Sequence, residues 1–533
     1  MKHALLFPAL LFLTLPAAAQ LLDSTFALNG YTQTTSFTGT ATDMSVASDG
    51  KIILSLDKRV GENQTCWSYV CRYEPDGTLD SAFGINGLAK VWSAGDDVVV
   101  NSVSVQPDGK IVFTGHGDYC NQIVCGMNNI VVGRFTAQGV IDSSFGTNGQ
   151  VLCGPLFGAY IMESLGQHVA VLPNGQILVS GRIYDQVGGV DVFVARLNSD
   201  GSLDPSYGAD GDGISRLGNY ASVEDMHVGN SGEVHLTGIA YIQNDTNNLS
   251  DSYVFRLTPG GVFDNSFGSQ GKVFLNAAKF DFMHALALRQ DGKIVLGGCI
   301  RRVPANFSAP IDTAAIFMLE PNGALSSVIP QGFRLLHMPK PASRIYDLEV
   351  ASGNAIFITG TLDSAYRTDA FVGRLNSDAS FDPSFSGTGE SFVYYHLGVF
   401  TTYQAGTMLY DMQRISPAQI LVSGGRNHIP STKQSVLLMR LNATESITTS
   451  IAAPGGASFE IYPNPFNEIV RLENSAQETG TYALYNAGGQ LLRKERLSAG
   501  TMQLDLREFA DGLYLLVVET ESGKRSFRMI KGN

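Results

Sequence analysis

One short phrase recurs along this chain at near-constant intervals. The segment QPDGKIVFTG begins at residue 106, and QDGKIVLGG begins at residue 290. Asp-Gly and Asn-Gly pairs favour the positive backbone angles of a two-residue hairpin turn. Apolar, β-rich runs flank each pair, so each copy predicts a β-hairpin. The turns fall at 49–50, 108–109, 174–175, 231–232, 291–292 and 352–353, with a degenerate copy at 417–418.

A second and a third phrase follow each hairpin in fixed order. The second is a strand that ends in Arg, as in FVARLNSDGSLD, and the third carries an Asp, as in LDPSYGADG. A catalytic group is normally needed once, so residues that recur in nearly every unit predict structural Arg–Asp pairs. The recurring residues are Arg72, Arg134, Arg196, Arg256, Arg374 and Arg440, and Asp23, Asp80, Asp142, Asp204, Asp264 and Asp382.

The third phrase sets the period of the chain. Ser326 replaces the Asp in the fifth unit, and successive spacings from Asp23 to Asp382 are 57, 62, 62, 60, 62 and 56 residues. Seven units therefore lie between Asp23 and about Asn442, and no amphipathic helix is evident among them. Such units hide their apolar faces by stacking on one another. We favour an all-β, seven-bladed propeller, because a closed ring protects sheet edges, over an open β-solenoid.

The three phrases resemble the delta-60 repeat, a propeller-like repeat of exported bacterial proteins. The resemblance covers roughly four fifths of the chain, residues 20–442. The fifth unit departs most, since Met318 stands in place of the Arg, and the seventh unit lacks the Gly of the turn. The resemblance implies a fold and no chemistry.

Both ends of the chain predict export. Lys2, an apolar run and Ala17-Ala18-Ala19 form a signal peptide over residues 1–19, which is too short to span a membrane. Residues 443–458 have the Ser-, Thr- and Gly-rich composition of a linker. Residues 459–533 then predict a small, immunoglobulin-like β-sandwich. We expect a protein without a transmembrane segment.

The last 75 residues resemble the type A C-terminal sorting domain of the type IX secretion system, which is found in Bacteroidota. The residues that carry this resemblance are Tyr462, Pro463, Asn464, Pro465, Gly512 and Tyr514. The resemblance implies the secretion machinery as a partner and transport across the outer membrane. It also implies either release or attachment to the outer cell surface.

Composition narrows the class of partner. The net charge is −13, and it becomes −14 when the segment carrying Lys2 is removed. An acidic chain argues against nucleic acid as a partner, because nucleic acid selects basic patches. We expect a monomer with a protein or glycan ligand and no cofactor.

Export permits disulfides. Cys66 and Cys71 have the same spacing as Cys120 and Cys125 in the next unit. We favour one local bridge in each pair, and pairing across the two units is the alternative. The spacing is not that of a zinc site.

The sequence contains no recognisable catalytic or metal motif, and we assign no catalytic residue. Asp210 and Asp212 lie beside glycines and would suit Ca²⁺, but a polar turn explains them equally well. A ligand rim is instead expected where the units differ, at the residue after the second strand of each hairpin. The polar members of this set are Asp57, His116, Arg182 and Thr361.

Two functions follow from these observations. The first is a non-enzymatic binding or adhesion module on the cell surface or in the medium. The second is a polysaccharide hydrolase or lyase, which would need a cluster of acidic residues that breaks the repeat symmetry on one face.

Overall fold

A computed structural model gives the fold in two compact units, Met1–Ser446 and Ile447–Asn533. The division falls within the expected linker, which itself lies outside the described residues, as does the expected signal peptide. The structure describes residues 22–27, 29–34, 39–60, 65–91, 98–119, 127–152, 161–185, 189–241, 250–277, 280–302, 311–340, 342–364, 367–383, 385, 392–395, 406–427, 434–442, 459–462, 468–474, 479–486, 491–510, 512–520 and 523–531.

In its described part, the first unit contains seven four-stranded antiparallel sheets. The first three sheets are β2 (Thr40–Val46), β3 (Ile52–Val60), β4 (Thr65–Tyr73) and β5 (Leu88–Lys90); β6 (Val98–Val105), β7 (Ile111–Tyr119), β8 (Met127–Phe135) and β9 (Gln150–Leu152); and β10 (Ile161–Val171), β11 (Ile177–Asp185), β12 (Val190–Leu197) and β13 (Ile214–Asn219). The next three are β14 (Ser222–Val228), β15 (Val234–Tyr241), β16 (Ser250–Leu257) and β17 (Lys272–Leu275); β18 (Asp281–Leu288), β19 (Ile294–Arg302), β20 (Ile311–Leu319) and β21 (Phe333–Leu335); and β22 (Ala342–Val350), β23 (Ile356–Ser364), β24 (Arg367–Leu375) and β25 (Phe392–Tyr395). A short 3₁₀ turn, Pro330–Gly332, precedes β21.

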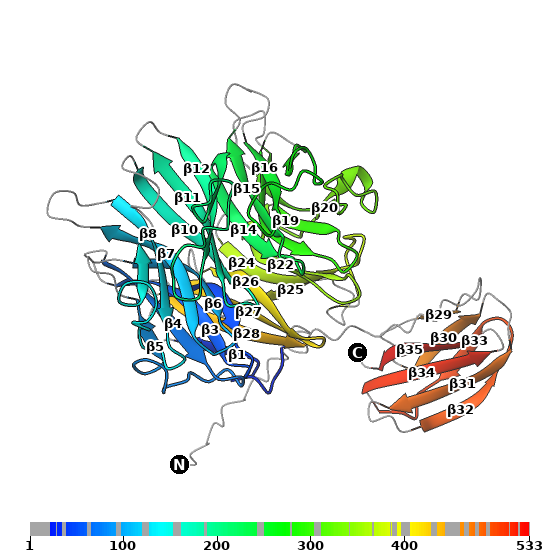
Figure 1. The fold of residues 1–533 in the computed structure, drawn as a ribbon. Coiled ribbons are helices and arrows are strands. Elements are labelled where there is room, and N and C mark those ends of the chain that lie inside the picture. Colours follow the sequence, from blue (N-terminus) through cyan, green and yellow to red (C-terminus); the bar gives the residue numbers. More distant parts are fainter. Residues whose placement is uncertain are drawn as a thin grey trace, which may run out of the picture. The chain divides into compact units, whose positions relative to one another are not determined.

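The seventh sheet joins the two ends of the unit. It contains β26 (Thr407–Ser416), β27 (Gln419–Asn427) and β28 (Gln434–Asn442), and its fourth strand is β1 (Tyr31–Thr34) from the start of the chain. Tyr31 pairs with Met439, and Thr34 pairs with Val436. Figure 1 shows β1 beside β28, although some 400 residues separate them.

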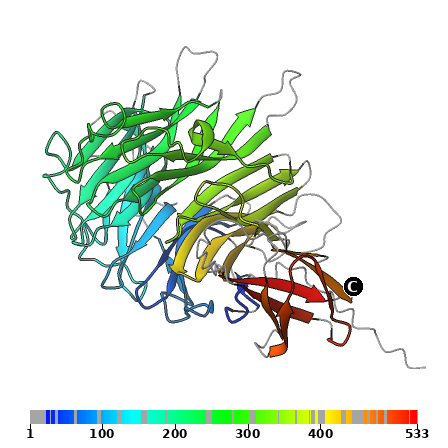
Figure 2. The ribbon, with the colours of Figure 1, turned by 90° about the vertical axis from the view of Figure 1, so that its right-hand side faces the viewer.

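The seven sheets follow one another in a closed cycle (Figures 1 and 2). The first strands β2, β6, β10, β14, β18, β22 and β26 each contact the next, and β26 contacts β2. The first strands therefore surround a common centre, and the short fourth strands lie at the opposite edge of each sheet.

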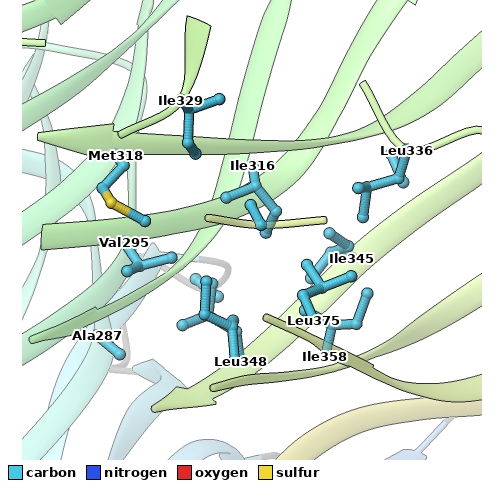
Figure 3. Packing of buried hydrophobic residues seen from close by; sticks show 14 of the residues in the cluster. Ala287, Val295, Ile316, Met318, Ile329, Leu336, Ile345, Leu348, Ile358 and Leu375 are labelled. Atoms are coloured by element: carbon cyan, nitrogen blue, oxygen red, sulfur yellow. The ribbon is translucent and has the colours of Figure 1, made fainter. Parts of the chain in front are cut away.

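A hydrophobic cluster fills each junction between neighbouring sheets. Figure 3 shows the junction of the fifth and sixth sheets, where Ile316 and Met318 of β20 meet Ile345 and Leu348 of β22. The junction that closes the cycle is filled in the same way, because Leu438 of β28 shares a cluster with Leu54 of β3. Burial of this apolar surface is the main force that holds neighbouring sheets together.

The predicted hairpins are present, and the first six have a different turn, whereas Ser416 pairs with Gln419 in the seventh and leaves the expected two residues. Ala47 N donates to Lys51 O, which leaves three residues in the first turn. Gly50 has φ of 84°, whereas Asp49 keeps a negative φ. A two-residue type I′ turn would need positive φ at both central residues, so the expected two-residue turn is wrong here and a three-residue turn takes its place. In the sixth unit the positive φ belongs to Asn354 (62°), one residue later than predicted.

The expected Arg–Asp pairs are confirmed. In each, Nε of the arginine donates to Oδ2 of an aspartate, at 2.8 Å for Arg134 and Asp142 and 2.7 Å for Arg196 and Asp204. Arg440 pairs with Asp23 at 2.8 Å, which ties the last strand to the first residues of the unit. We call this set the arginine clasp, and its pairs are Arg72–Asp80, Arg134–Asp142, Arg196–Asp204, Arg256–Asp264, Arg374–Asp382 and Arg440–Asp23.

The clasp also joins neighbouring sheets. Nη1 of Arg134 donates to Ser199 O at 2.5 Å, and Nη1 of Arg196 donates to Pro259 O at 2.7 Å, in each case in the next unit. Each guanidinium also lies over an aromatic ring three residues after the aspartate, such as Tyr207, whose ring centre is 4.6 Å from Arg196 Cζ.

The fifth unit replaces the clasp with an arginine from another strand. Met318 occupies the arginine position, and Arg289, which lies before the turn of the hairpin, contacts Met318 Sδ at 3.5 Å. Nη1 of Arg289 donates to Ser377 O in the next unit at 2.7 Å, as the other clasp arginines do. Ser326, in place of the aspartate, donates to Glu320 at 2.5 Å. The contact between sheets is thus kept although the sequence pattern is lost.

The second unit consists of two antiparallel sheets around one small core. One sheet has the order β29 (Phe459–Tyr462), β30 (Ile469–Asn474), β33 (Met502–Asp505), and the other β32 (Leu491–Leu497), β31 (Gly480–Asn486), β34 (Gly512–Thr520), β35 (Gly523–Lys531). Leu472, Leu484 and Leu516 are buried between them. This unit has its own core.

Candidate functional site

Each first strand carries one extra residue at the same place, a β-bulge. The register between β2 and β3 shifts between Ala41 and Asp43, so Thr42 has no partner on β3. The same shift occurs in all seven sheets. We call the seven extra residues the bulge ring: Thr42, Asn101, Gln167, Glu224, His284, Tyr346 and Tyr410.

A glycine on the second strand permits most of these bulges. A Cβ atom on Gly115 would lie 1.9 Å from Val99 O, and one on Gly360 would lie 1.9 Å from Arg344 O. Only a residue without a side chain accepts so close a backbone approach. The glycine that closes phrases such as KIVFTG therefore has a purpose that the sequence alone did not reveal.

Three members of the bulge ring are used to hold the next sheet, and we call them the polar arc: Thr42, Asn101 and Gln167. The Asn101 amide donates to Gly166 O at 2.7 Å. The Gln167 amide donates to Val223 O at 2.7 Å and accepts from Val223 N at 3.2 Å. Thr42 is exposed; its hydroxyl hydrogen-bonds to Ser55 Oγ of its own sheet at 2.7 Å and makes a longer contact to Val100 O of the next sheet, at 3.4 Å.

The other four members contact one another, and we call them the aromatic arc: Glu224, His284, Tyr346 and Tyr410. Glu224 Oε2 lies 3.1 Å from His284 Nδ1. The His284 and Tyr346 rings are 5.7 Å apart, and the Tyr346 and Tyr410 rings 5.2 Å. One side chain from each of four successive sheets thus forms a continuous chemical surface at the centre of the unit.

Glu224 is charged within this arc. Burial opposes ionisation, but the hydrogen bond and charge of His284 and the hydrogen bond from Ser222 hold the pKa of Glu224 below its usual value. Ser222 Oγ lies 2.6 Å from Glu224 Oε1. Because Nδ1 of His284 faces Glu224, its Nε2 points away from the carboxylate.

A second layer of acidic side chains follows the bulge ring. Oδ2 of Asp43, Asp225 and Asp347 accepts from Val103 N, Leu286 N and Met412 N in the next sheet, at 2.7, 2.7 and 2.6 Å. Burial, followed by repulsion from Asp411, Asp225 and Glu349, raises the pKa of Asp347 well above its usual value. Burial and the neighbouring Asp43 likewise raise the pKa of Asp411. These carboxyl groups are bound into the fold, and burial favours the uncharged forms of Asp347 and Asp411 by raising the pKa of each.

The predicted rim residues lie beside the bulge ring, one strand further from the centre. His116 of β7 pairs with Val99, and its Nδ1 lies 3.4 Å from the Asn101 amide. Nη1 of Arg182 donates to Ala221 O of the next sheet at 3.1 Å. The other two positions differ: Thr361 is buried, and the Asp57 side chain lies outside the described residues.

The expected bridge between Cys66 and Cys71 is wrong. Both residues lie on the single strand β4, and Cys71 is a buried free thiol. A strand rises about 3.3 Å per residue, which places the two Cα atoms far beyond the roughly 7 Å that a disulfide spans. Cys120 and Cys125 lie outside the described residues.

The candidate calcium turn is held by protein contacts. Asp212 Oδ1 accepts from Ile214 N at 3.0 Å, and its Oδ2 pairs with Arg216 at 2.7 Å. Within the described residues, no group of three or more His, Cys, Asp or Glu side chains is arranged to hold a metal ion. No helix in the described part of the chain has the length and apolar character needed to cross a membrane.

The residues of the expected sorting motif lie at strand ends in the second unit. Tyr462 closes β29 and Gly512 opens β34, while Pro463, Asn464 and Pro465 lie outside the described residues. Tyr514 is buried, and its hydroxyl donates to Ala510 O.

The model of the secretion system C-terminal sorting domain matches residues 460–532. The C-terminal unit is a sorting domain. This agrees with the resemblance seen in the sequence to sorting domains of the type IX secretion system, and the sorting domain implies that the chain is secreted.

A beta-propeller domain of unknown function, DUF5122, matches residues 47–83 and 172–207. These segments contain the hairpin, the clasp arginine and the aspartate of the first and third units. The repeat unit of this chain is therefore a delta-60-like propeller repeat, as its phrases indicated. No curated protein matches the chain.

Solved structures with similar folds share little sequence with the chain. The polysaccharide lyase Uly1 is 10% identical over 76% of this chain and 90% of its own, with a TM-score of 0.43. The Trypanosoma rangeli sialidase is 10% identical over 96% of this chain and 90% of its own, with a TM-score of 0.39.

Proposed function

We propose that this protein is an exported, non-enzymatic binding module: a seven-bladed β-propeller that binds a protein or glycan ligand at the aromatic arc of the bulge ring, followed by an immunoglobulin-like sorting domain. A signal peptide over residues 1–19 and the type IX secretion machinery carry it to the outer cell surface or into the medium. It acts there as a monomer.

The single observation that carries the binding site is the loss of repeat symmetry at the bulge ring. Where the arginine clasp repeats, the ring presents six residue types in seven sheets, with only Tyr used twice. The side chains of the aromatic arc contact one another from sheet to sheet. The outer margin of the proposed binding site consists of the rim residues Asp57, His116, Arg182 and Thr361.

The closed cycle of seven sheets supports the blade count. The core at the junction of the last and first sheets and the pairing of β1 with β28 oppose an open solenoid, which would end in unpaired sheets.

The second candidate, a polysaccharide hydrolase or lyase, needs an acidic cluster free to act on substrate. An acidic cluster does lie at the centre, yet Asp43, Asp225 and Asp347 hold backbone amides of the next sheet. This observation favours binding over cleavage.

Two measurements test the proposal. Deletion of residues 447–533 is expected to retain the protein inside the outer membrane, and a deleted form found outside in normal amounts would contradict the sorting role. The fluorescently labelled, secreted chain is expected to bind cell envelopes, and Glu224→Gln to reduce the bound fraction. Turnover in a screen of polysaccharides would instead support the enzyme.

A further inference from the structure

We infer that the aromatic arc binds a neutral saccharide, a sugar chain without carboxylate or sulfate groups. This inference rests on the proposed function, because it names the ligand class of the same ring.

The two tyrosines supply the apolar part of such a site. The Tyr346 and Tyr410 rings meet at 50°, and both side chains are only partly buried. Aromatic rings present a flat apolar face together with a polar tip. A sugar ring has the matching form, with C–H groups on its faces and hydroxyl groups around its edge.

Glu224 and His284 supply the polar part. An ionised carboxylate only accepts hydrogen bonds and has about four acceptor positions. Ser222 and His284 occupy one position on each oxygen of Glu224, which leaves positions for ligand hydroxyl groups. Hydrogen bonds to a charged acceptor are stronger than neutral ones. Because His284 Nδ1 faces Glu224, its Nε2 points away from the carboxylate and could bond a second hydroxyl group of the ligand.

The surrounding charge selects an uncharged ligand. The charged Glu224 would repel carboxylate or sulfate groups brought to the aromatic arc, in a chain of net charge −13. A bound cation would be attracted less strongly than the number of carboxyl groups suggests. Burial raises the pKa of Asp347 and of Asp411 and so favours their uncharged forms.

The test is calorimetric titration of the secreted chain with three probes: neutral hexose oligosaccharides, galacturonic acid oligosaccharides and spermidine. We expect the neutral oligosaccharides to bind most tightly. Tyr346→Ala and Glu224→Gln should each weaken that binding by about tenfold or more, as for buried aromatic and charged contacts in other sites. Tyr346→Phe keeps the ring and should change the dissociation constant by less than about threefold.

Thr42→Ala is the matched control, because Thr42 belongs to the same ring but lies in the polar arc and is exposed. It should leave the dissociation constant within about twofold. Tighter binding of the anionic or the cationic probe, or neutral binding that is unchanged in both a folded Tyr346→Ala and Glu224→Gln, would overturn the inference.

The envelope assay separates this inference from the proposed function. If no saccharide binds while Glu224→Gln still reduces envelope binding, the saccharide is wrong and the binding site stands. If Glu224→Gln changes neither measurement, both proposals fail.

Discussion

The arginine clasp and the bulge ring are built on the same repeated strands but differ in how they vary. Six clasp arginines make nearly the same ion pair, with Nε to Oδ2 distances from 2.6 to 2.8 Å. The bulge ring has six residue types in seven sheets, with Tyr in two of them. The clasp joins each sheet to the next, so every sheet needs it. The ring lies where seven sheets meet, so its members are free to differ.

The fifth unit shows what the clasp selects for. In this unit the arginine, Arg289, follows the first strand, whereas in the other units it lies near the end of the third strand. The hydrogen bond to the next sheet is present in both arrangements. What the units share is an arginine that donates to a backbone carbonyl of the next sheet, and this contact can be made from two different positions in the repeat.

The largest effect is expected from breaking the clasp. Arg134→Met leaves the buried Asp142 with only Lys110, 3.2 Å away, as an ionic partner, and loss of one member of a buried ion pair costs about 3–5 kcal/mol where no partner remains. We expect the free energy of unfolding in urea to fall by about 3 kcal/mol. The control is Arg216→Met, whose ion pair with Asp212 is exposed and should contribute less than about 1 kcal/mol. Equal losses in the two variants would show that the clasp is no stronger than a surface pair.

A smaller effect is expected in the fifth unit. Arg289→Gln removes the donor to Ser377 O and should cost about 2 kcal/mol, the range for a hydrogen bond from a charged group. Addition of Met318→Arg and Ser326→Asp restores the usual clasp and should recover at least half of the loss. Urea unfolding of the single and triple variants measures both. No recovery would mean that the fifth unit has adapted beyond these positions.

Local spacing made the clasp predictable, because Arg196 and Asp204 are eight residues apart and recur together. The bulge ring was not predictable in the same way. In the first six units its members align only when counted eight residues back from the positive-φ residue of the turn, and in the sixth unit that residue is Asn354 and not the predicted Gly353. Arg289 was missed because the carbonyl that it binds, Ser377 O, lies 88 residues further along the chain.

The cysteine prediction failed for a related reason. A short spacing suggested a loop between Cys66 and Cys71, but β4 runs straight through both residues. Trp67, Tyr69 and Cys71 occupy alternate positions, which is typical of a β-strand. This alternation indicated that no turn lies between Cys66 and Cys71.

The centre of the molecule should respond to pH differently from the clasp. Burial, followed by the charge of Asp225, raises the pKa of Glu349 to about 7 in spite of Arg414, above its usual 4.5. The folded state therefore binds the proton more tightly, so the stability from Glu349 is full below about pH 4.5 and is lost as the pH rises through about 7. Glu349→Gln should raise the free energy of unfolding at pH 8 by about 2 kcal/mol and leave it nearly unchanged at pH 4.5.

The clasp aspartates respond in the opposite direction, which provides the internal control. Burial opposes ionisation of Asp204, but hydrogen bonds from Ser206 and Arg196 lower its pKa to about 2. Its stabilising contribution is present above about pH 4 and is lost as the pH falls through 2. Denaturation between pH 4.5 and 8 is therefore insensitive to the clasp, and the difference between Glu349→Gln and the unaltered chain isolates Glu349. A pH profile that is unchanged in Glu349→Gln would contradict the assignment.

The smallest effect is expected from the polar arc. Asn101→Ala removes the amide that donates to Gly166 O and should lower the free energy of unfolding by about 1 kcal/mol, the usual value of one neutral hydrogen bond. Thr42→Ala loses a longer contact to the next sheet and a hydrogen bond to Ser55 of its own sheet, so it should cost no more than about 1 kcal/mol. Urea denaturation of both variants tests whether this half of the ring holds sheets together. If Asn101→Ala costs nothing and instead weakens ligand binding, the two arcs share one function, and the division of the ring into a structural and a binding half is wrong.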